Sequence, residues 1–314
     1  MRSARVKRRG LDVDPRSRLS GSISLRRAET LPKRCSPGSP TSTAEADTLA
    51  DVVTTRPYLD RTPLALAHRG GSTYPPNVGL ENTMTAFGNA VAMGYTHVET
   101  DVHVTRDGRL VAFHDTVLDR VTDAHGRIRD LPWSAVSQAR IGAGEHVPLL
   151  TEVLDTWPDI RLNIDLKAPG TAEPLWRLIQ DRALHGQVCV GSFSQRSISQ
   201  FRRLSRGSVA TAAAQAGTAL ARFGPRLLTA MVRTPADVFQ VPPTVSVRGR
   251  VVQVVTPRLV AAAHRHGKQV HVWTIDDADE MHGLLDLGVD GLVSDRIDVL
   301  KDVLLERGCW TGRS

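Results

Sequence analysis

The sequence has few cysteines and no long apolar run. Its three cysteines are Cys35, Cys189 and Cys309, and their spacing matches neither C-x-x-C nor C-x-x-H, so neither a disulfide framework nor a zinc site is expected. No stretch reaches the roughly 18 apolar residues of a transmembrane helix, and the basic start lacks the apolar segment of a signal peptide. We therefore expect a cytoplasmic protein without a transmembrane segment, in which Cys189 is a buried, unreactive thiol.

Aromatic residues are also scarce, at 4% of the 314 residues, whereas hydrophobic residues together reach 41%. The apolar side chains are mainly those of alanine, valine and leucine, which suit a parallel sheet covered by helices on its faces. The length is sufficient for one large domain. The composition thus favours a globular α/β protein.

The positive charge is concentrated at one end of the chain. The formal net charge is +7, but residues 1–34 alone contain 11 Lys and Arg against 3 acidic residues, a balance of +8 that leaves −1 for the rest. Residues 1–60 are rich in Ser, Pro and Thr and show no apolar periodicity, which is typical of a disordered tail. Because a basic tail is usually solvated, we expect no nucleic-acid partner.

From Leu64 onward, short apolar runs alternate with helical patterns, as in "LALAH", "THVETDVHV", "IRLNIDLK", "QVCVGSF" and "QVHVWTID". Such alternation indicates parallel strands joined by right-handed helical crossovers. Residues 61–308 match the roughly 250 residues of a (β/α)₈ TIM barrel. Segment 115–148 is predicted to be a small insertion after the second strand region, and 217–257 should hold the fifth helix and sixth strand.

Two predicted strands carry polar side chains on one face only. Alternate residues of a strand point to opposite sides, so "THVETDVHV" and "RLNIDLK" each have one polar and one mainly apolar face. Because helices cover the outside of a parallel barrel, the polar faces should point inward. Glu99, Asp101 and Asp165 would then converge, and a cation must offset their charge. An all-oxygen ligand set selects Mg²⁺ or Ca²⁺ over Zn²⁺.

Several motifs resemble those of the glycerophosphodiester phosphodiesterase family. They are "AHRGG" at 67–71, "ENTMTAF" at 81–87, "VETDVHVTRDGRLVAFHD" at 98–115 and "LNIDLK" at 162–167. The later segments "VHVWTID" and "GVDGLVSDR" are similar to later barrel strands of that family, so the resemblance covers most of 63–300. Each motif alone is weak, but their order and spacing are specific. The resemblance implies hydrolysis of a small-molecule glycerophosphodiester to an alcohol and glycerol 3-phosphate.

The resemblance also assigns roles to individual residues. It implies catalysis by His68 and His114, metal binding by Glu99 and Asp101, and phosphate binding by Arg69 and Lys167. Asp165 stands where the family has a Glu as third metal ligand, and its shorter side chain leaves the ligand geometry open. Trp273 matches an aromatic residue beside the alcohol part of the substrate, and Glu81 is expected to support the site from behind.

These roles agree with what phosphodiester hydrolysis needs. The transition state gains negative charge, so fixed cations must contact the phosphate oxygens while protons move at both ends of the reaction. Histidine suits proton transfer because its pKa lies near neutrality. One histidine would take a proton from the glycerol 2-hydroxyl or a water, and the other would protonate the leaving alcohol. Four further histidines lack this support and are expected to be structural, with His103 as the first candidate for an exception: His97, His103, His125 and His271.

Two alternatives remain at this point. The related phospholipase-D-type toxins have an Asp at the position of Asp165, which leaves lysophospholipid cleavage open. This reading needs a membrane-docking element, for which only Leu131, Pro132 and Trp133 in segment 115–148 are candidates. The second alternative is a barrel that binds phosphate esters without catalysis, although a binding protein has no need of two histidines.

Overall fold

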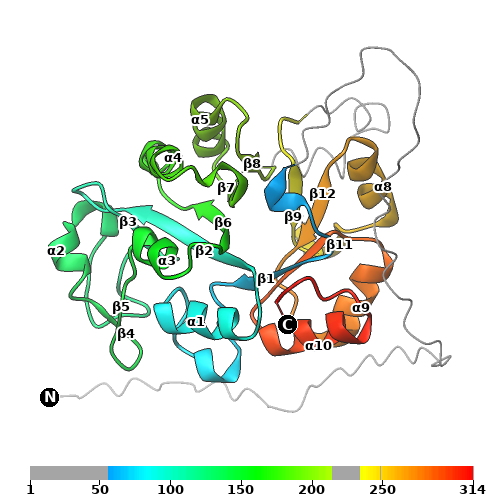
Figure 1. Ribbon diagram of the computed structural model, residues 1–314, viewed down its shortest axis with the longest axis horizontal. Coiled ribbons are helices and arrows are strands. Elements are labelled where there is room, and N and C mark those ends of the chain that lie inside the picture. The colour runs from blue at the N-terminus through cyan, green and yellow to red at the C-terminus, as the bar shows by residue number, and fades with distance from the viewer. Residues whose placement is uncertain (1–55, 214–233, 248, 314) are drawn as a thin grey trace, which may run out of the picture. The chain divides into compact units, whose positions relative to one another are not determined.

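The fold is a barrel of eight parallel strands. The computed structural model describes residues 56–213, 234–247 and 249–313. In chain order the barrel strands are β1 (Leu64–His68), β2 (His97–Val104), β6 (Arg161–Leu166), β7 (Val188–Gly191), β8 (Ala210–Thr211), β9 (Val238–Val241), β12 (Gln269–Val272) and β13 (Gly291–Ser294). Each pairs in parallel with the next, β13 returns to β1, and a parallel bridge between Ala212 and Val238 joins β8 to β9. The predicted (β/α)₈ barrel is therefore confirmed (Figure 1).

Helices surround the strands (Figure 1). They are α1 (Met84–Ala92), α3 (Leu150–Thr156), α4 (Ala172–Asp181), α5 (Gln195–Ser205), α8 (Pro257–Arg265), α9 (Ala278–Asp286) and α10 (Ile297–Glu306), with the short turns η2 (Pro75–Asn77) and η4 (Leu184–Gly186). Four of them begin at a Ser, Thr or Asp whose side chain accepts a hydrogen bond from the third helical residue, which satisfies one free amide of the first turn. Residues 217–233, the first part of the region expected to hold the fifth helix, lie outside the described residues.

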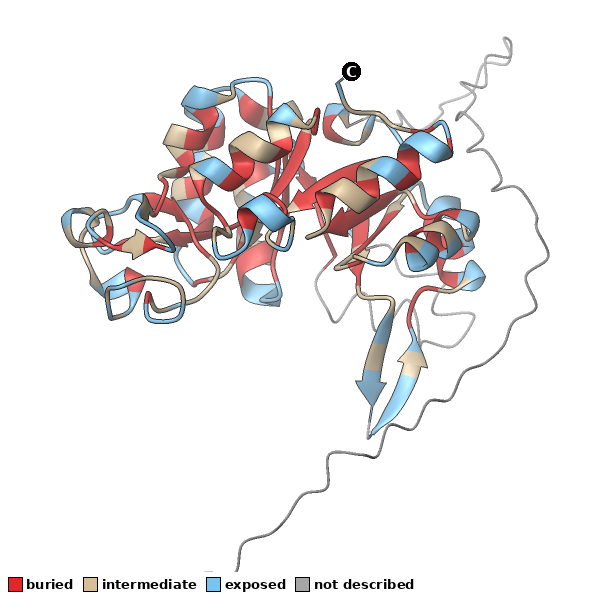
Figure 2. Cartoon of the chain, turned by 90° about the horizontal axis from the view of Figure 1, so that it is seen from below, coloured by how far each residue is buried: buried red, intermediate tan, exposed pale blue. Residues whose placement is uncertain are grey.

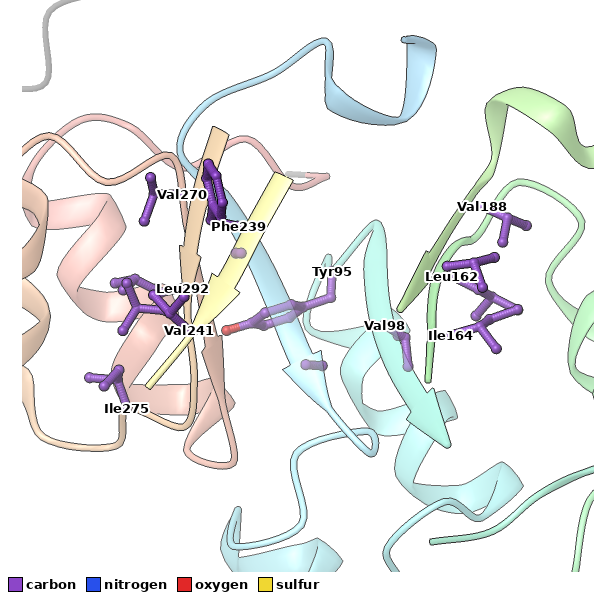
Figure 3. Close-up of a cluster of buried hydrophobic side chains, with 14 of the residues drawn as sticks. Tyr95, Val98, Leu162, Ile164, Val188, Phe239, Val241, Val270, Ile275 and Leu292 are labelled. Carbon is purple, nitrogen blue, oxygen red and sulfur yellow. The ribbon is translucent and has the colours of Figure 1, made fainter. Parts of the chain in front are cut away.

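The main hydrophobic core lies between the strands and the helices. Val98 and Val102 of β2 belong to it, as do Leu162 and Ile164 of β6 (Figure 3). A second, smaller core that includes Leu66 and Val293 fills the barrel. The apolar faces of β2 and β6 pack against the helices, so the alternate polar residues of both strands point into the barrel.

Segment 115–148 forms a small lobe with a core of its own. It contains η3 (Ile128–Asp130), α2 (Trp133–Val136) and the antiparallel pair β4 (Arg140–Ile141) and β5 (Glu145–His146). Its buried residues include Leu118, Val136 and Val147. The preceding β3 (Leu110–Ala112) pairs antiparallel with the end of β2, so "LVAFH" extends the sheet outward and is not a barrel strand.

A hairpin that is not paired with the barrel sheet follows β9. It consists of β10 (Thr244–Val247) and β11 (Arg250–Gln253), and it projects from the barrel (Figure 2). Val247 and Val251 are exposed on it. The hairpin and Pro242 and Pro243 before it explain why the sequence between β9 and α8 lacks a regular pattern.

Folded structure begins before residue 61. Residues Pro57–Leu59 form η1, and Tyr58 is fully buried in the core inside the barrel. The ring of Tyr58 packs edge-on against His97, whose Nε2 lies 3.3 Å from the Tyr58 carbonyl oxygen. The prediction of a disordered tail otherwise falls on residues 1–55, which lie outside the described residues. No helix in the described ranges is long and apolar enough to cross a membrane.

Two histidines are buried on barrel strands away from the charged pocket. Burial lowers the pKa of His97 on β2 to about 4 and that of His271 on β12 to about 3. His271 bonds Gln269 through Nε2, and its Nδ1 has no hydrogen-bond partner among the described residues. Both histidines are therefore held in the neutral form, as expected for structural residues.

Replacing His271 with leucine is expected to make the protein less sensitive to acid. The unfolded histidine titrates near pH 6.5, far above its folded pKa of about 3. As the pH falls below 6.5 the unfolded chain takes up the extra proton, so this group removes up to about 1.4 kcal/mol of stability per pH unit. Urea unfolding at pH 7, 6 and 5 should show the variant gaining stability relative to the wild type by that amount. For the control Val270→Ala, the difference in unfolding free energy from the wild type should not depend on pH. A pH-independent difference for His271→Leu would contradict the prediction.

Candidate active site

A pocket of about 540 Å³ opens at the carboxyl ends of the barrel strands. Polar side chains from β1, β2 and β6 line one part of it, and mainly apolar side chains from β13, from the hairpin region and from the residue after β12 line another. Eight of the nine residues predicted for the site line this pocket: His68, Arg69, Glu99, Asp101, His114, Asp165, Lys167 and Trp273. The ninth, Glu81, is not in the lining and contacts Arg69 from outside it.

His68 is the last residue of β1, and carboxylates flank both nitrogens of its ring. Its Nδ1 lies 2.8 Å from Asp295 Oδ1, and its Nε2 lies 3.7 Å from Glu99 Oε2. Burial lowers the pKa of His68, but the charge of Glu99 and the hydrogen bond to Asp295 outweigh burial and leave the pKa above its usual value. The hydrogen bond of Nδ1 to Asp295, which follows β13, fixes the ring so that Nε2 is the nitrogen available for proton transfer.

The turn after β1 explains the sequence His-Arg-Gly-Gly. Arg69 has a φ of 51°, a left-handed conformation that a residue with a side chain rarely adopts. Its amide donates to Glu99 Oε2 at 3.2 Å. A Cβ on Gly70 would lie 2.8 Å from the backbone of Ala86, and one on Gly71 would lie 2.8 Å from Ile297, so both positions require glycine. This tight turn brings Arg69 back over the end of the barrel.

Two cations lie among the acidic residues. Lys167 Nζ is 2.8 Å from Asp101 Oδ1 and 2.7 Å from Asp165 Oδ2, so it links the two carboxylates that face each other across β2 and β6. Arg69 Nε is 3.1 Å from Asp101 Oδ2 but makes no hydrogen bond with good geometry to any described residue. A buried guanidinium nitrogen without a hydrogen-bond acceptor is suited to an anionic ligand such as phosphate.

The acidic residues differ in how well their charge is balanced. Burial would raise the pKa of Asp101, but Lys167 and Arg69 hold it below the usual value. Burial and the neighbouring Asp101 raise the pKa of Glu99 to about 8. Glu99 is thus a buried carboxylate whose negative charge the nearby cations do not fully offset.

The uncompensated negative charge at Glu99 is relevant to whether the site can bind a metal ion. Within the described ranges no three His, Cys, Asp or Glu side chains form a ready-made metal cluster. Lys167 lies between Asp101 and Asp165, where it takes one oxygen of each. Even so, Glu99, Asp101 and Asp165 line one pocket, and Glu99 remains under-compensated. An all-oxygen set with excess negative charge fits a hard divalent cation.

His114 reaches the pocket from the end of β3, at the border of segment 115–148. Its Nδ1 lies 2.6 Å from Asp115 Oδ1. The hydrogen bond from Arg120, together with His114 itself, lowers the pKa of Asp115 to about 2, so Asp115 is a carboxylate at any working pH. His103 Nε2 lies 3.1 Å from the carbonyl oxygen of His114, so His103 supports the backbone here and does not line the pocket.

Glu81 and Asn82 contact Arg69 and Asp101 of the pocket by hydrogen bonds. Glu81 Oε1 accepts from Arg69 Nη1 at 3.3 Å. Asn82 Nδ2 donates to Asp101 Oδ2 at 3.0 Å. Trp273 lies in the apolar part of the pocket, where its ring centroid is 5.6 Å from that of Phe193 in an edge-on arrangement.

Sequence reasoning missed several residues of the site. Asp295 directly follows the last barrel strand, and an acidic residue at such a strand end is a signal that would have identified it. Arg120 has no comparable signal, because its contacts depend on how segment 115–148 folds. The same holds for Phe193 and for the hairpin residues Val245 and Val247, which complete the pocket.

Comparisons with known proteins agree with this geometry. A family model described as the glycerophosphoryl diester phosphodiesterase family matches residues 68–299. A probable glycerophosphodiester phosphodiesterase 2 of Mycobacterium tuberculosis is 39% identical over 254 residues, which cover 79% of this chain and 93% of that protein. A crystal structure of a putative glycerophosphoryl diester phosphodiesterase from Silicibacter pomeroyi has a TM-score of 0.66 at 21% identity and covers 79% of this chain and 95% of its own.

A further similar structure is of an Oleispira antarctica phosphodiesterase in complex with the product sn-glycerol-3-phosphate. Its TM-score is 0.63 at 22% identity, and the match covers 77% of this chain and 97% of that chain. At this level of identity the two structures establish the shared fold.

Proposed function

Because the chain belongs to the glycerophosphoryl diester phosphodiesterase family and is a phosphodiesterase, we propose that it hydrolyses glycerophosphodiesters to glycerol 3-phosphate and an alcohol, with His68 and His114 as the acid–base pair. One observation carries this proposal. Two histidines, each with Nδ1 beside a carboxylate, share a pocket with Arg69 and Lys167. Such an arrangement provides two proton-transfer groups and fixed positive charge for a phosphate.

The two imidazoles account for every proton that moves in the proposed reaction. One imidazole takes the proton of the glycerol 2-hydroxyl while that oxygen attacks phosphorus. The bond from phosphorus to the alcohol oxygen breaks, and the other imidazole protonates the leaving oxygen. Water then opens the cyclic phosphate with the two roles reversed, which restores both histidines. Arg69 and Lys167 hold the non-bridging oxygens throughout, where negative charge develops.

Glu99, Asp101 and Asp165 are the residues that would hold a divalent cation, Mg²⁺ or Ca²⁺. A bound cation supplies Lewis-acid stabilisation of the charge on the phosphoryl oxygens. The raised pKa of Glu99 supports this assignment, because an under-compensated buried carboxylate is stabilised by a nearby cation. Lys167 contacts both Asp101 and Asp165, so it would lie beside the cation.

Lysophospholipid cleavage is a second candidate, and the apolar wall of the pocket favours it. Phe193, Val245, Val247 and Val254 line this wall together with Trp273. The membrane-docking element expected at Leu131, Pro132 and Trp133 does not support this candidate, because the side chains of Leu131 and Trp133 pack against the core of segment 115–148. A hydrocarbon group would therefore contact the hairpin and not that segment.

A substrate panel tests both candidates. Glycerophosphocholine, glycerophosphoethanolamine and lysophosphatidylcholine are incubated with the protein, and the released alcohol and glycerol 3-phosphate are quantified. The proposed function predicts glycerol 3-phosphate from the first two and slower turnover of the lipid. Faster release of choline from lysophosphatidylcholine would favour the second candidate, and no turnover of any diester would favour a binding protein.

The cytoplasmic location stays a prediction.

A further inference from the structure

Arg120 of segment 115–148 contacts the supports of both halves of the site. Its Nε lies 2.7 Å from Asp115 Oδ2, and its Nη2 lies 3.1 Å from Asp115 Oδ1. The same guanidinium reaches Glu81, with Nη2 at 2.5 Å from Oε1 and Nη1 at 3.1 Å from Oε2. It thus binds two carboxylates with two hydrogen bonds each, a geometry that the planar fork of arginine allows and a lysine does not.

Each carboxylate in turn holds a residue of the reaction pocket. Asp115 holds Nδ1 of His114, and Glu81 accepts from Nη1 of Arg69. A continuous chain of contacts therefore runs from one histidine to the phosphate-binding arginine through Arg120. Arg120 itself does not line the pocket and is about half exposed, so it acts through its neighbours.

The charges of the residues in this series of contacts indicate what Arg120 does. Glu81 is the only carboxylate shared between Arg120 and Arg69 in the described part of the chain, and its contacts to Arg120 are shorter. Without Arg120 the full charge of Glu81 would fall on Arg69 and compete with a substrate phosphate. Asp115 would likewise lose the partner that fixes its orientation toward His114.

We propose that Arg120 is a positioning residue that serves proton transfer and phosphate binding at once: it orients Asp115 against His114 and draws the charge of Glu81 away from Arg69. This inference rests on the proposed function. It predicts that the two effects are separable, because Asp115 should influence kcat and Glu81 should influence KM.

The test compares Arg120→Met with Arg129→Met, measured on glycerophosphocholine. Arg129 lies in the same segment and pairs only with the adjacent Asp130 among the ion pairs of the described residues. Arg120→Met should lower kcat and raise KM, each about tenfold, in the range usual for residues that orient a site. Arg129→Met should keep wild-type values. Matching melting temperatures of the two variants would show that both are folded.

A second substitution distinguishes charge balance from general damage. In Arg120→Met/Glu81→Gln the amide still accepts from Arg69 but carries no charge, so KM should return to within about threefold of the wild type while kcat stays low. Inorganic phosphate, measured by calorimetry with Mg²⁺ present, should bind about tenfold more weakly to Arg120→Met and recover in the double variant. Wild-type kinetics in Arg120→Met, or a further rise of KM in the double variant, would overturn the proposal. If the wild type hydrolyses no diester, the proposed function fails, and the phosphate measurement still decides the role of Arg120 toward Arg69.

Discussion

Replacing His68 or His114 with alanine is expected to lower kcat on glycerophosphocholine by about 10²–10⁴-fold, the usual contribution of a positioned acid or base. Each imidazole lines the pocket, and a carboxylate fixes the nitrogen that faces away from the reaction. Alanine removes the proton carrier but leaves Arg69 and Lys167 in place. KM should therefore change much less than kcat, because the phosphate-binding groups remain.

His125→Ala is a suitable control for these variants. His125 is exposed in segment 115–148, and its Nδ1 lies 3.2 Å from Asp119, outside the pocket lining. This variant should turn over substrate at the wild-type rate. If either His68→Ala or His114→Ala also kept a near-normal rate, that histidine would have no part in the chemistry.

Removing divalent metal is expected to lower activity about a thousandfold, since Lewis-acid stabilisation of a phosphoryl transition state is worth roughly several kcal/mol. The experiment dialyses the protein against chelator and then adds Mg²⁺ or Ca²⁺ separately while the rate is followed. Activity should return with at least one of the two ions, because the donor set consists of carboxylate oxygens.

Asp165→Asn refines the same prediction. The amide keeps the size of the side chain but removes one negative charge, so a higher concentration of metal should be needed for half-maximal activity. Asp298→Asn alters an acidic residue that pairs with Arg296 at 2.8 Å outside the pocket and should leave the metal requirement unchanged. Full activity in chelator would contradict the assignment of Glu99, Asp101 and Asp165 as metal ligands.

The barrel and the centre of its site were predictable because local patterns determine them. Strand alternation directs Glu99 and Asp101 to the same side of β2. The parallel pairing of β2 with β6 then places Asp165 directly opposite Asp101. Once helices cover the outer face, these side chains have only the barrel interior to enter. For the same reason the histidine that ends β1 could be placed at the pocket.

Other parts of the site depend on contacts between distant segments and could not be predicted. Arg120 meets Glu81 across 39 positions of sequence, and only the folding of segment 115–148 brings them together. His68 meets Asp295 through the closure of β1 against β13, 227 positions apart. The hairpin that supplies Val245 and Val247 to the pocket follows a proline pair, which in the sequence indicated only a break in the pattern.

A crystal structure with glycerol 3-phosphate and Mn²⁺ bound would test the central geometry most directly, since anomalous scattering would locate the metal. We expect the ion beside Glu99, Asp101 and Asp165, with the phosphate in contact with Arg69 and Lys167 and an imidazole of His68 or His114 on either side. A phosphate bound outside this pocket, or an ion that none of the three carboxylates contacts, would contradict the proposed mechanism.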